Sequence, residues 1–169
     1  DLQAIEHRQT ADIDRYNKQL IKAGADVSDL RVHVLENQLL HRTFFQVSLA
    51  QRNTAKEKFA FIAAHIDLLQ DWWHVDQLTQ FFRQPVDFGL AFAQAEQHIA
   101  SELPFERRWG YVLFLTGLQK DPAHTRQILS LIKDDDEYYV QMAEAWLIAD
   151  LSVFNMPEVK RFAEQTEIK

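Results

Sequence analysis

The chain is organised around the stretch Asp71-Trp72-Trp73-His74-Val75-Asp76-Gln77-Leu78. Asp71 belongs to the residue types that cap helix N-termini, and a helix that begins there places Trp72 and Asp76 on one face. An indole beside a carboxylate suits a site where positive charge develops on a flat ring, because the π-face and the anion both stabilise a cation. A structural alternative stays open here, with Trp72 in the core and Asp76 solvated or ion-paired.

Helix-start signals recur after this stretch. Asp87 is a capping residue, and Pro104 and Pro122 suit the first turn of a helix. One of the aspartates at 134–136 is expected to cap the next helix, and Pro157 is expected to open the last one. The starts near 71, 87, 104, 121, 136 and 156 pair into three units with a period of about 33 residues.

Three tryptophans are also regularly spaced. Trp72, Trp109 and Trp146 lie at intervals of 37 residues, and we expect Trp109 to be a core residue. Helix pairs with such a period indicate an α-solenoid, in which each pair buries its apolar face against its neighbours and the stack leaves a concave groove. The sequence therefore predicts an all-α fold of antiparallel helix pairs near 71-103, 104-135 and 136-169. A helix bundle without true repeats is the alternative.

The first 70 residues are expected to form further helices. Gly24 ends the first of them, and Ser28 is expected to cap a helix that carries Val32, Leu35 and Leu39. Thr54-Ala55-Lys56-Glu57 has the pattern of a capping box. We expect residues 1-70 to precede the repeats within one domain that spans residues 1-169.

Composition supports a folded, helical chain. Of its 169 residues 47% are apolar, with four glycines and four prolines and no cysteine, so neither a disulfide framework nor a thiolate nucleophile is possible. No apolar run approaches the ~18 residues of a membrane span, and we expect a cytoplasmic monomer that does not bind membranes. The start Asp1-Leu2-Gln3 lacks Met, so we expect a trimmed N-terminus.

The charge is unevenly distributed. Residues 1–83 carry 10 Lys/Arg and 11 Asp/Glu, whereas residues 84–169 carry 8 and 14, and the whole chain has a formal net charge of −7. An acidic surface repels a phosphate backbone, so any binding to double-stranded DNA is expected to be weak.

Several chemistries lack their motifs. No glycine-rich loop or Gly-x-x-x-x-Gly-Lys is present to cradle phosphates, which excludes the common nucleotide cofactor sites. The seven histidines form neither His-Glu-x-x-His nor Glu-x-x-His, and no serine lies in a nucleophile elbow. We therefore expect no metal, no cofactor and no acyl-transfer triad.

Three segments resemble a known family, the AlkD-like DNA alkylation repair proteins with HEAT-like repeats. Asp71-Trp72-Trp73-His74-Val75-Asp76 is similar to the family's Asn-Trp-x-x-x-Asp helix, and Glu106-Arg107-Arg108-Trp109-Gly110-Tyr111-Val112 resembles its Arg-x-Ala-Ile segment. Residues 138–146 resemble its Phe-x-Gln-Lys-Ala-x-Gly-Trp helix, the most specific of the three. The resemblance covers roughly residues 54–165 and implies a HEAT-like superhelix of the ARM/HEAT type.

The resemblance also implies an activity. Members hydrolyse the N-glycosidic bond of cationic alkylpurines, such as 3-methyladenine and 7-methylguanine, as monofunctional DNA glycosylases. By the same resemblance Asp76 is the catalytic carboxylate, which positions water and stabilises an oxocarbenium-like sugar. Trp72 and Trp146 become aromatic walls around the damaged nucleotide. Arg108 becomes a contact to the DNA backbone, with Arg107 beside it in the expected groove.

Some positions depart from the family pattern. Ala149 stands where an arginine follows the pocket tryptophan, and Asp150 comes next. Phe105 replaces a tryptophan, and the chain is expected to be shorter than active members at both ends. Two readings remain: a DNA-repair hydrolase that uses Asp76, or a non-catalytic paralogue that acts as a weak DNA-binding or protein-interaction scaffold.

Overall fold

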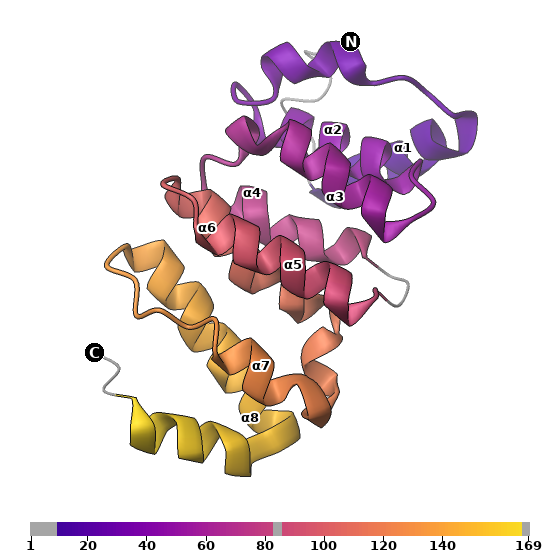
Figure 1. The fold of residues 1–169 in the computed structure, drawn as a ribbon. Helices are drawn as coiled ribbons and strands as arrows, with labels where there is room; N and C mark the ends of the chain where they lie inside the picture. The colour runs from indigo at the N-terminus through magenta and orange to yellow at the C-terminus, as the bar shows by residue number, and fades with distance from the viewer. Residues whose placement is uncertain (1–9, 83–85, 167–169) are drawn as a thin grey trace. The chain divides into compact units, whose positions relative to one another are not determined.

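The computed structural model describes residues 10–82 and 86–166, which contain helices and no strands (Figure 1). The all-α fold class is thereby confirmed, while the HEAT-like superhelix stays a prediction. The chain divides into two compact units, residues 1–68 and 69–169. None of the described helices is long and apolar enough to span a membrane.

The first unit is built around α2, whose buried face includes Phe44 and Phe45. α1 packs against α2, and Phe61 of α3 adds its ring to those two aromatic side chains, with centroid distances of 5.5 and 6.0 Å. Its elements are α1 (Thr10–Ala23), the 3-10 helix η2 (Ser28–His33), α2 (Gln38–Ala50), α3 (Ala55–Ala64) and η3 (Ile66–Leu68).

Two of the predicted signals in this unit are confirmed. Gly24 ends α1 with a φ of +63°, a backbone conformation that favours glycine. Thr54 and Glu57 form the predicted capping box at the start of α3: the Thr54 side chain accepts from the Glu57 amide at 3.2 Å, and the Glu57 carboxylate accepts from the Thr54 amide at 3.0 Å.

The predicted helix from Ser28 to Leu39 is wrong. Ser28 opens only a 3-10 helix, and Val32 is 72% exposed. The α-helix begins at Gln38, because Asn37 provides the cap by accepting a hydrogen bond from the Leu39 amide at 2.8 Å. The apolar spacing from Val32 to Leu39 thus suggested one helix, whereas the structure has two, η2 and α2, separated by a turn.

The second unit is organised around α6. This helix packs against α4, α5 and α8, while α7 packs against α8. The elements are α4 (Trp72–Asp76), η4 (Gln77–Phe81), α5 (Phe88–Ile99), α6 (Pro104–Val112), η5 (Leu113–Thr116), η6 (Leu118–Lys120), η7 (Pro122–His124), α7 (Thr125–Leu129) and α8 (Tyr138–Gln165). The segment Arg83-Gln84-Pro85, whose proline is expected to end the preceding helix, lies outside the described residues. The single-domain boundaries and the three repeat pairs stay predictions.

Most helix starts in this unit follow the sequence signals. The Asp71 carboxylate accepts from the Trp72 amide at 2.7 Å, and Asp87 accepts from the Leu90 amide at 2.8 Å. Pro104 occupies the first turn of α6. These three local signals act within one turn of the chain, so sequence alone is sufficient to locate them.

The start and the break of α8 differ in how well they were predicted. The expected aspartate cap is wrong, because Glu137 is the N-cap residue and makes no side-chain cap hydrogen bond. Asp135 instead accepts from the Glu137 amide at 2.9 Å. The expected second helix is present, since Asn155 has non-helical φ and ψ of −149° and 64°, and Pro157 lies in the turn that follows.

Close packing of α5 on α6 fixes the face that carries the candidate site. Trp109 is fully buried, which confirms its predicted core role. At Gly110 a Cβ atom would lie 2.6 Å from Ile99 Cγ1 and 3.1 Å from the Ala95 carbonyl oxygen. Only a residue without a side chain permits this approach of the two backbones.

We expect Gly110→Ala to destabilise the protein by about 1–3 kcal/mol, because the added methyl group collides with the backbone of α5. Gly89→Ala is the matched control, since the nearest atom to its Cβ is 3.4 Å away and alanine favours the helix. Urea unfolding of both variants measures the difference. Equal midpoints for the two variants would contradict the tight contact.

Candidate functional site

An ion pair joins Asp76 and Arg108, two of the charged residues that the family resemblance places in one site. Arg108 of α6 donates from Nε to Asp76 Oδ1 at 2.9 Å and from Nη2 to Oδ2 at 2.8 Å. The Arg108 side chain is 5% exposed and the Asp76 side chain 20% exposed. The pair is therefore bidentate, with the cation inside the fold and the Asp76 side chain partly exposed to solvent.

A third helix completes this arrangement. Arg108 also donates from Nη1 to the carbonyl oxygen of Tyr139, in the first turn of α8. The guanidinium thus links α4, which carries Asp76 at its C-terminal end, to α6 and α8. Because the Tyr139 contact is made by a backbone oxygen, no side-chain pattern in the sequence predicts it.

Both predicted aromatic walls are exposed. Trp72 is 45% exposed and lies one helical turn before Asp76, so its indole is not a core side chain. Trp146 is 43% exposed and lies seven residues after Tyr139 on α8, close to two full turns. Met142, 49% exposed, occupies the same stripe of α8. An aromatic and thioether surface therefore runs along α8 from the anchor of Arg108.

Further aromatic side chains lie beside the ion pair. The ring centroid of Phe105, one turn before Arg108 on α6, is 5.7 Å from that of Tyr139. Tyr138 meets Tyr139 edge to face with centroids 5.2 Å apart, and 63% of Tyr138 is exposed. Phe105 therefore packs against α8 rather than standing alone in a groove. This contact cannot be predicted from the sequence alone, because it depends on which helix lies next to α6.

Arg107 is committed to a different set of contacts. It binds Asp135 in a bidentate pair, from Nε at 2.7 Å and from Nη2 at 3.0 Å. Its Nη1 donates to the carbonyl oxygens of Ser101 and Glu102 at 3.2 and 3.1 Å. The hydrogen bonds to Asp135 raise the pKa of Arg107, and burial opposes them. Arg107 therefore holds the turn before α6 to the loop before α8.

Ion pairing extends to the other arginines that the structure describes in the second unit. Arg126 donates from Nε to Glu158 at 2.8 Å, and Arg161 contacts the same carboxylate. With Arg107 and Arg108, all four described arginines of this unit are paired with carboxylates inside the chain. The expected groove therefore offers little uncompensated arginine charge.

His74 supports the site helix from inside. It is 7% exposed, and its Nδ1 accepts a hydrogen bond from the Gln70 amide at 3.0 Å. Burial lowers the pKa of His74 to about 4, against a smaller opposing effect of Asp71. The ring is therefore neutral at pH 7, with its proton on Nε2.

Comparison with known protein families gives a match over most of the chain. The family model described as DNA alkylation repair enzyme matches residues 9–169. The curated proteins and the solved structures give no significant match. The match includes both helices of the ion pair and the whole of α8.

The buried His74 makes stability depend on pH. As the pH falls from 6.5 towards 4, the unfolded chain binds a proton at His74 and the folded chain does not, so the free energy of unfolding decreases. The expected loss is at most ~1.4 kcal/mol per pH unit, and about 3 kcal/mol in total. Urea unfolding between pH 7.5 and 4.5 measures it against His74→Gln, which isolates this residue from titrating carboxylates. Parallel pH profiles for wild type and variant would refute the assignment.

Proposed function

The chain belongs to the DNA alkylation repair enzyme family, and we propose that it hydrolyses the N-glycosidic bond of cationic alkylpurines in DNA. 3-Methyladenine and 7-methylguanine are the proposed lesions, and Asp76 is the proposed catalytic carboxylate. The observation that carries the proposal is that a buried arginine binds both carboxylate oxygens of Asp76 while part of the Asp76 side chain remains exposed to solvent. Such fixation is what a catalytic carboxylate requires.

Asp76 acts on the sugar and on the water. When the glycosidic bond breaks, positive charge develops on the deoxyribose, and a fixed carboxylate stabilises that charge without reorganisation. The exposed part of Asp76 accepts a hydrogen bond from the attacking water and orients it. As the C1′–O bond forms, the proton of the water passes through Asp76 to solvent. The base leaves with the bonding electron pair, which neutralises its positive charge, so no general acid is needed.

Trp72 and Trp146 hold the damaged nucleotide. Indole faces attract a cationic purine more strongly than a neutral one, by roughly 0.5–2 kcal/mol per ring. Both side chains have the exposure that such a contact needs. Selectivity for the lesion thus arises from charge, and a neutral base gains only the ordinary stacking energy.

The main proposed role of Arg108 is to position the Asp76 carboxylate, and contact with DNA is secondary. Its Nε, Nη1 and Nη2 atoms already donate to Asp76 and to the Tyr139 carbonyl, so contact with the DNA backbone is limited to the remaining donors. Arg107 is restricted in the same way by Asp135. DNA is therefore bound weakly in this proposal, mainly through the lesion itself.

A second candidate function is a non-catalytic scaffold that binds DNA weakly or binds a protein. It is favoured by the pairing of all four arginines that the structure describes in the second unit. Near Trp146 on α8, Ala149 supplies no positive charge and Asp150 adds a negative one. The two candidates differ in one measurable property, the release of a damaged base.

Release of 7-methylguanine from methylated duplex DNA tests the choice. Under single-turnover conditions we expect slow release by the wild type and a decrease of at least 100-fold in Asp76→Asn, in which the negative charge is lost. Asp71→Asn is the matched control on the same helix, because asparagine still caps α4. Circular dichroism checks that all three proteins are folded. If the folded wild type releases no base, the scaffold function is favoured.

Salt dependence tests the expected weak binding. Each phosphate neutralised contributes about −0.9 to the slope of log affinity against log salt, and we expect a wild-type slope smaller in magnitude than about 2. Ala149→Arg adds one cation to the stripe of Trp146 and should steepen the slope by about 0.9. Gln141→Arg adds the same charge to another face of α8 and should change it less. A steep wild-type slope would show that cations outside these arginines bind the backbone.

A further inference from the structure

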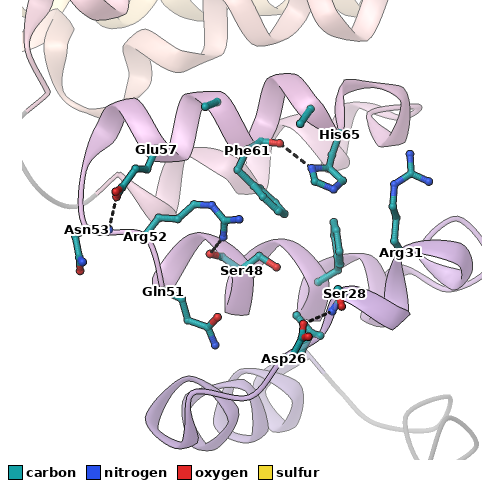
Figure 2. A pocket seen from close by; sticks show the side chains of 14 residues that line it. Asp26, Ser28, Arg31, Ser48, Gln51, Arg52, Asn53, Glu57, Phe61 and His65 are labelled. Carbon is teal, nitrogen blue, oxygen red and sulfur yellow. Dashed lines mark hydrogen bonds between the residues drawn. The ribbon is translucent and has the colours of Figure 1, made fainter.

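The first unit contains a cavity of about 820 Å³ whose lining residues all lie between Asp26 and His65 (Figure 2). α2 and α3 form two of its sides, and the turn before η2 forms a third. Small-molecule sites in proteins have volumes of ~300–1,000 Å³. The cavity is therefore large enough for a ligand, and nothing in the proposed function uses it.

A cation with unused donors lines this cavity. Arg52 is stacked over Phe61, with its guanidinium carbon 3.9 Å from the ring centroid. Its Nη1 donates to the Ser48 carbonyl oxygen, and among the described residues Nε and Nη2 have no hydrogen-bond partner. Burial lowers the pKa of Arg52, which marks a partly desolvated guanidinium, although it remains charged at neutral pH. Such a group binds an anion more strongly than an exposed one does.

The carboxylates near the cavity do not neutralise Arg52 by direct contact. Asp26 accepts from the Ser28 amide at 2.9 Å. Glu57 accepts from the amides of Asn53 and Thr54 at 3.0 Å as part of the helix cap. Both carboxylates are thus directed towards backbone amides. Glu57 interacts electrostatically with Arg52, but neither carboxylate forms a salt bridge with it in the described part of the chain.

Two aromatic rings, those of Phe61 and His65, also line the cavity. The His65 ring lies 4.2 Å from the Phe61 ring, and its Nδ1 is 2.8 Å from the Phe61 carbonyl oxygen. In the neutral ring Nδ1 then donates to that oxygen, which leaves Nε2 as an acceptor. Ala60 and Ala64, one turn apart on α3, line the cavity and leave space beside these rings. Phe61 lies between Arg52 on one side and His65 on the other (Figure 2).

We propose that this cavity binds a small planar organic phosphate of mononucleotide size. The phosphate binds to the free donors of Arg52, and the ring occupies the space beside Ala60 and Ala64, with His65 available to accept from an amino group of the ring. The site lies within the first unit and does not depend on Asp76. Its failure would therefore leave the proposed glycosylase function unaffected.

Calorimetric titration of the full chain tests this assignment with dAMP as the probe. Deoxyadenosine lacks the phosphate and inorganic phosphate lacks the ring, so each is expected to bind at least tenfold more weakly than dAMP. A 5′-phosphorylated oligo(dA) distinguishes two sources of the same chemistry. Binding weaker than that of dAMP indicates a free nucleotide, and equal or tighter binding indicates the end of a DNA strand.

Two variants locate the site. Arg52→Gln removes the cation, and Ala64→Leu fills the space for the ring; each should weaken dAMP binding at least tenfold. Arg15→Gln and Ala63→Leu are matched controls, since Arg15 is an exposed arginine of α1 and Ala63 an exposed alanine of α3, both outside the cavity. The controls should leave the dissociation constant unchanged.

Helix content, measured by circular dichroism, confirms that every variant is folded before it is titrated. The proposal is overturned if dAMP does not bind the folded wild type. It is equally overturned if dAMP binds but Arg52→Gln and Ala64→Leu, both folded, retain the wild-type affinity.

Discussion

One guanidinium determines the geometry of the second unit's candidate face. Arg108 is 4% exposed, and a cation so deeply buried is stable only when its donors are satisfied. Asp76 and the Tyr139 carbonyl satisfy them from two different helices, so α4, α6 and α8 meet at one residue. Removal of one partner from a buried ion pair typically costs about 3–5 kcal/mol. The ion pair that stabilises the fold therefore also fixes the orientation of the Asp76 carboxylate.

The same pairing limits what this face offers to DNA. Phosphate contacts supply most of the affinity of DNA-binding proteins, and they require cations that face outward. Arg107 and Arg108, which the sequence resemblance placed in a groove, both satisfy carboxylates within the chain. A residue that fixes the proposed catalytic carboxylate with most of its donors cannot also hold a phosphate with them. The donors of Arg108 that fix Asp76 are thus not available to bind the DNA backbone.

Local signals explain what was predictable from sequence. Asp71, Asp87 and Thr54 cap helices through amides within three residues, so their roles follow from residue type and position. Contacts between distant residues were less accessible. Asp76 and Arg108, 32 residues apart, were expected to lie near one another only because the resemblance placed both in one groove. The bond to the Tyr139 backbone and the use of Asp135 by Arg107, rather than as a cap, depend on tertiary packing that no local pattern specifies.

The acidic balance of the second half is compatible with selective repair, although it weakens binding. Negative potential raises the free energy of every phosphate contact, and it does so equally for damaged and undamaged DNA. The proposed attraction of Asp76, Trp72 and Trp146 for positive charge applies only to a cationic base. Because specificity is a difference of binding free energies, a penalty that is common to damaged and undamaged DNA lowers both affinities and leaves their ratio unchanged. The pairing of the arginines therefore argues against tight DNA binding and leaves the proposed recognition of a charged lesion intact.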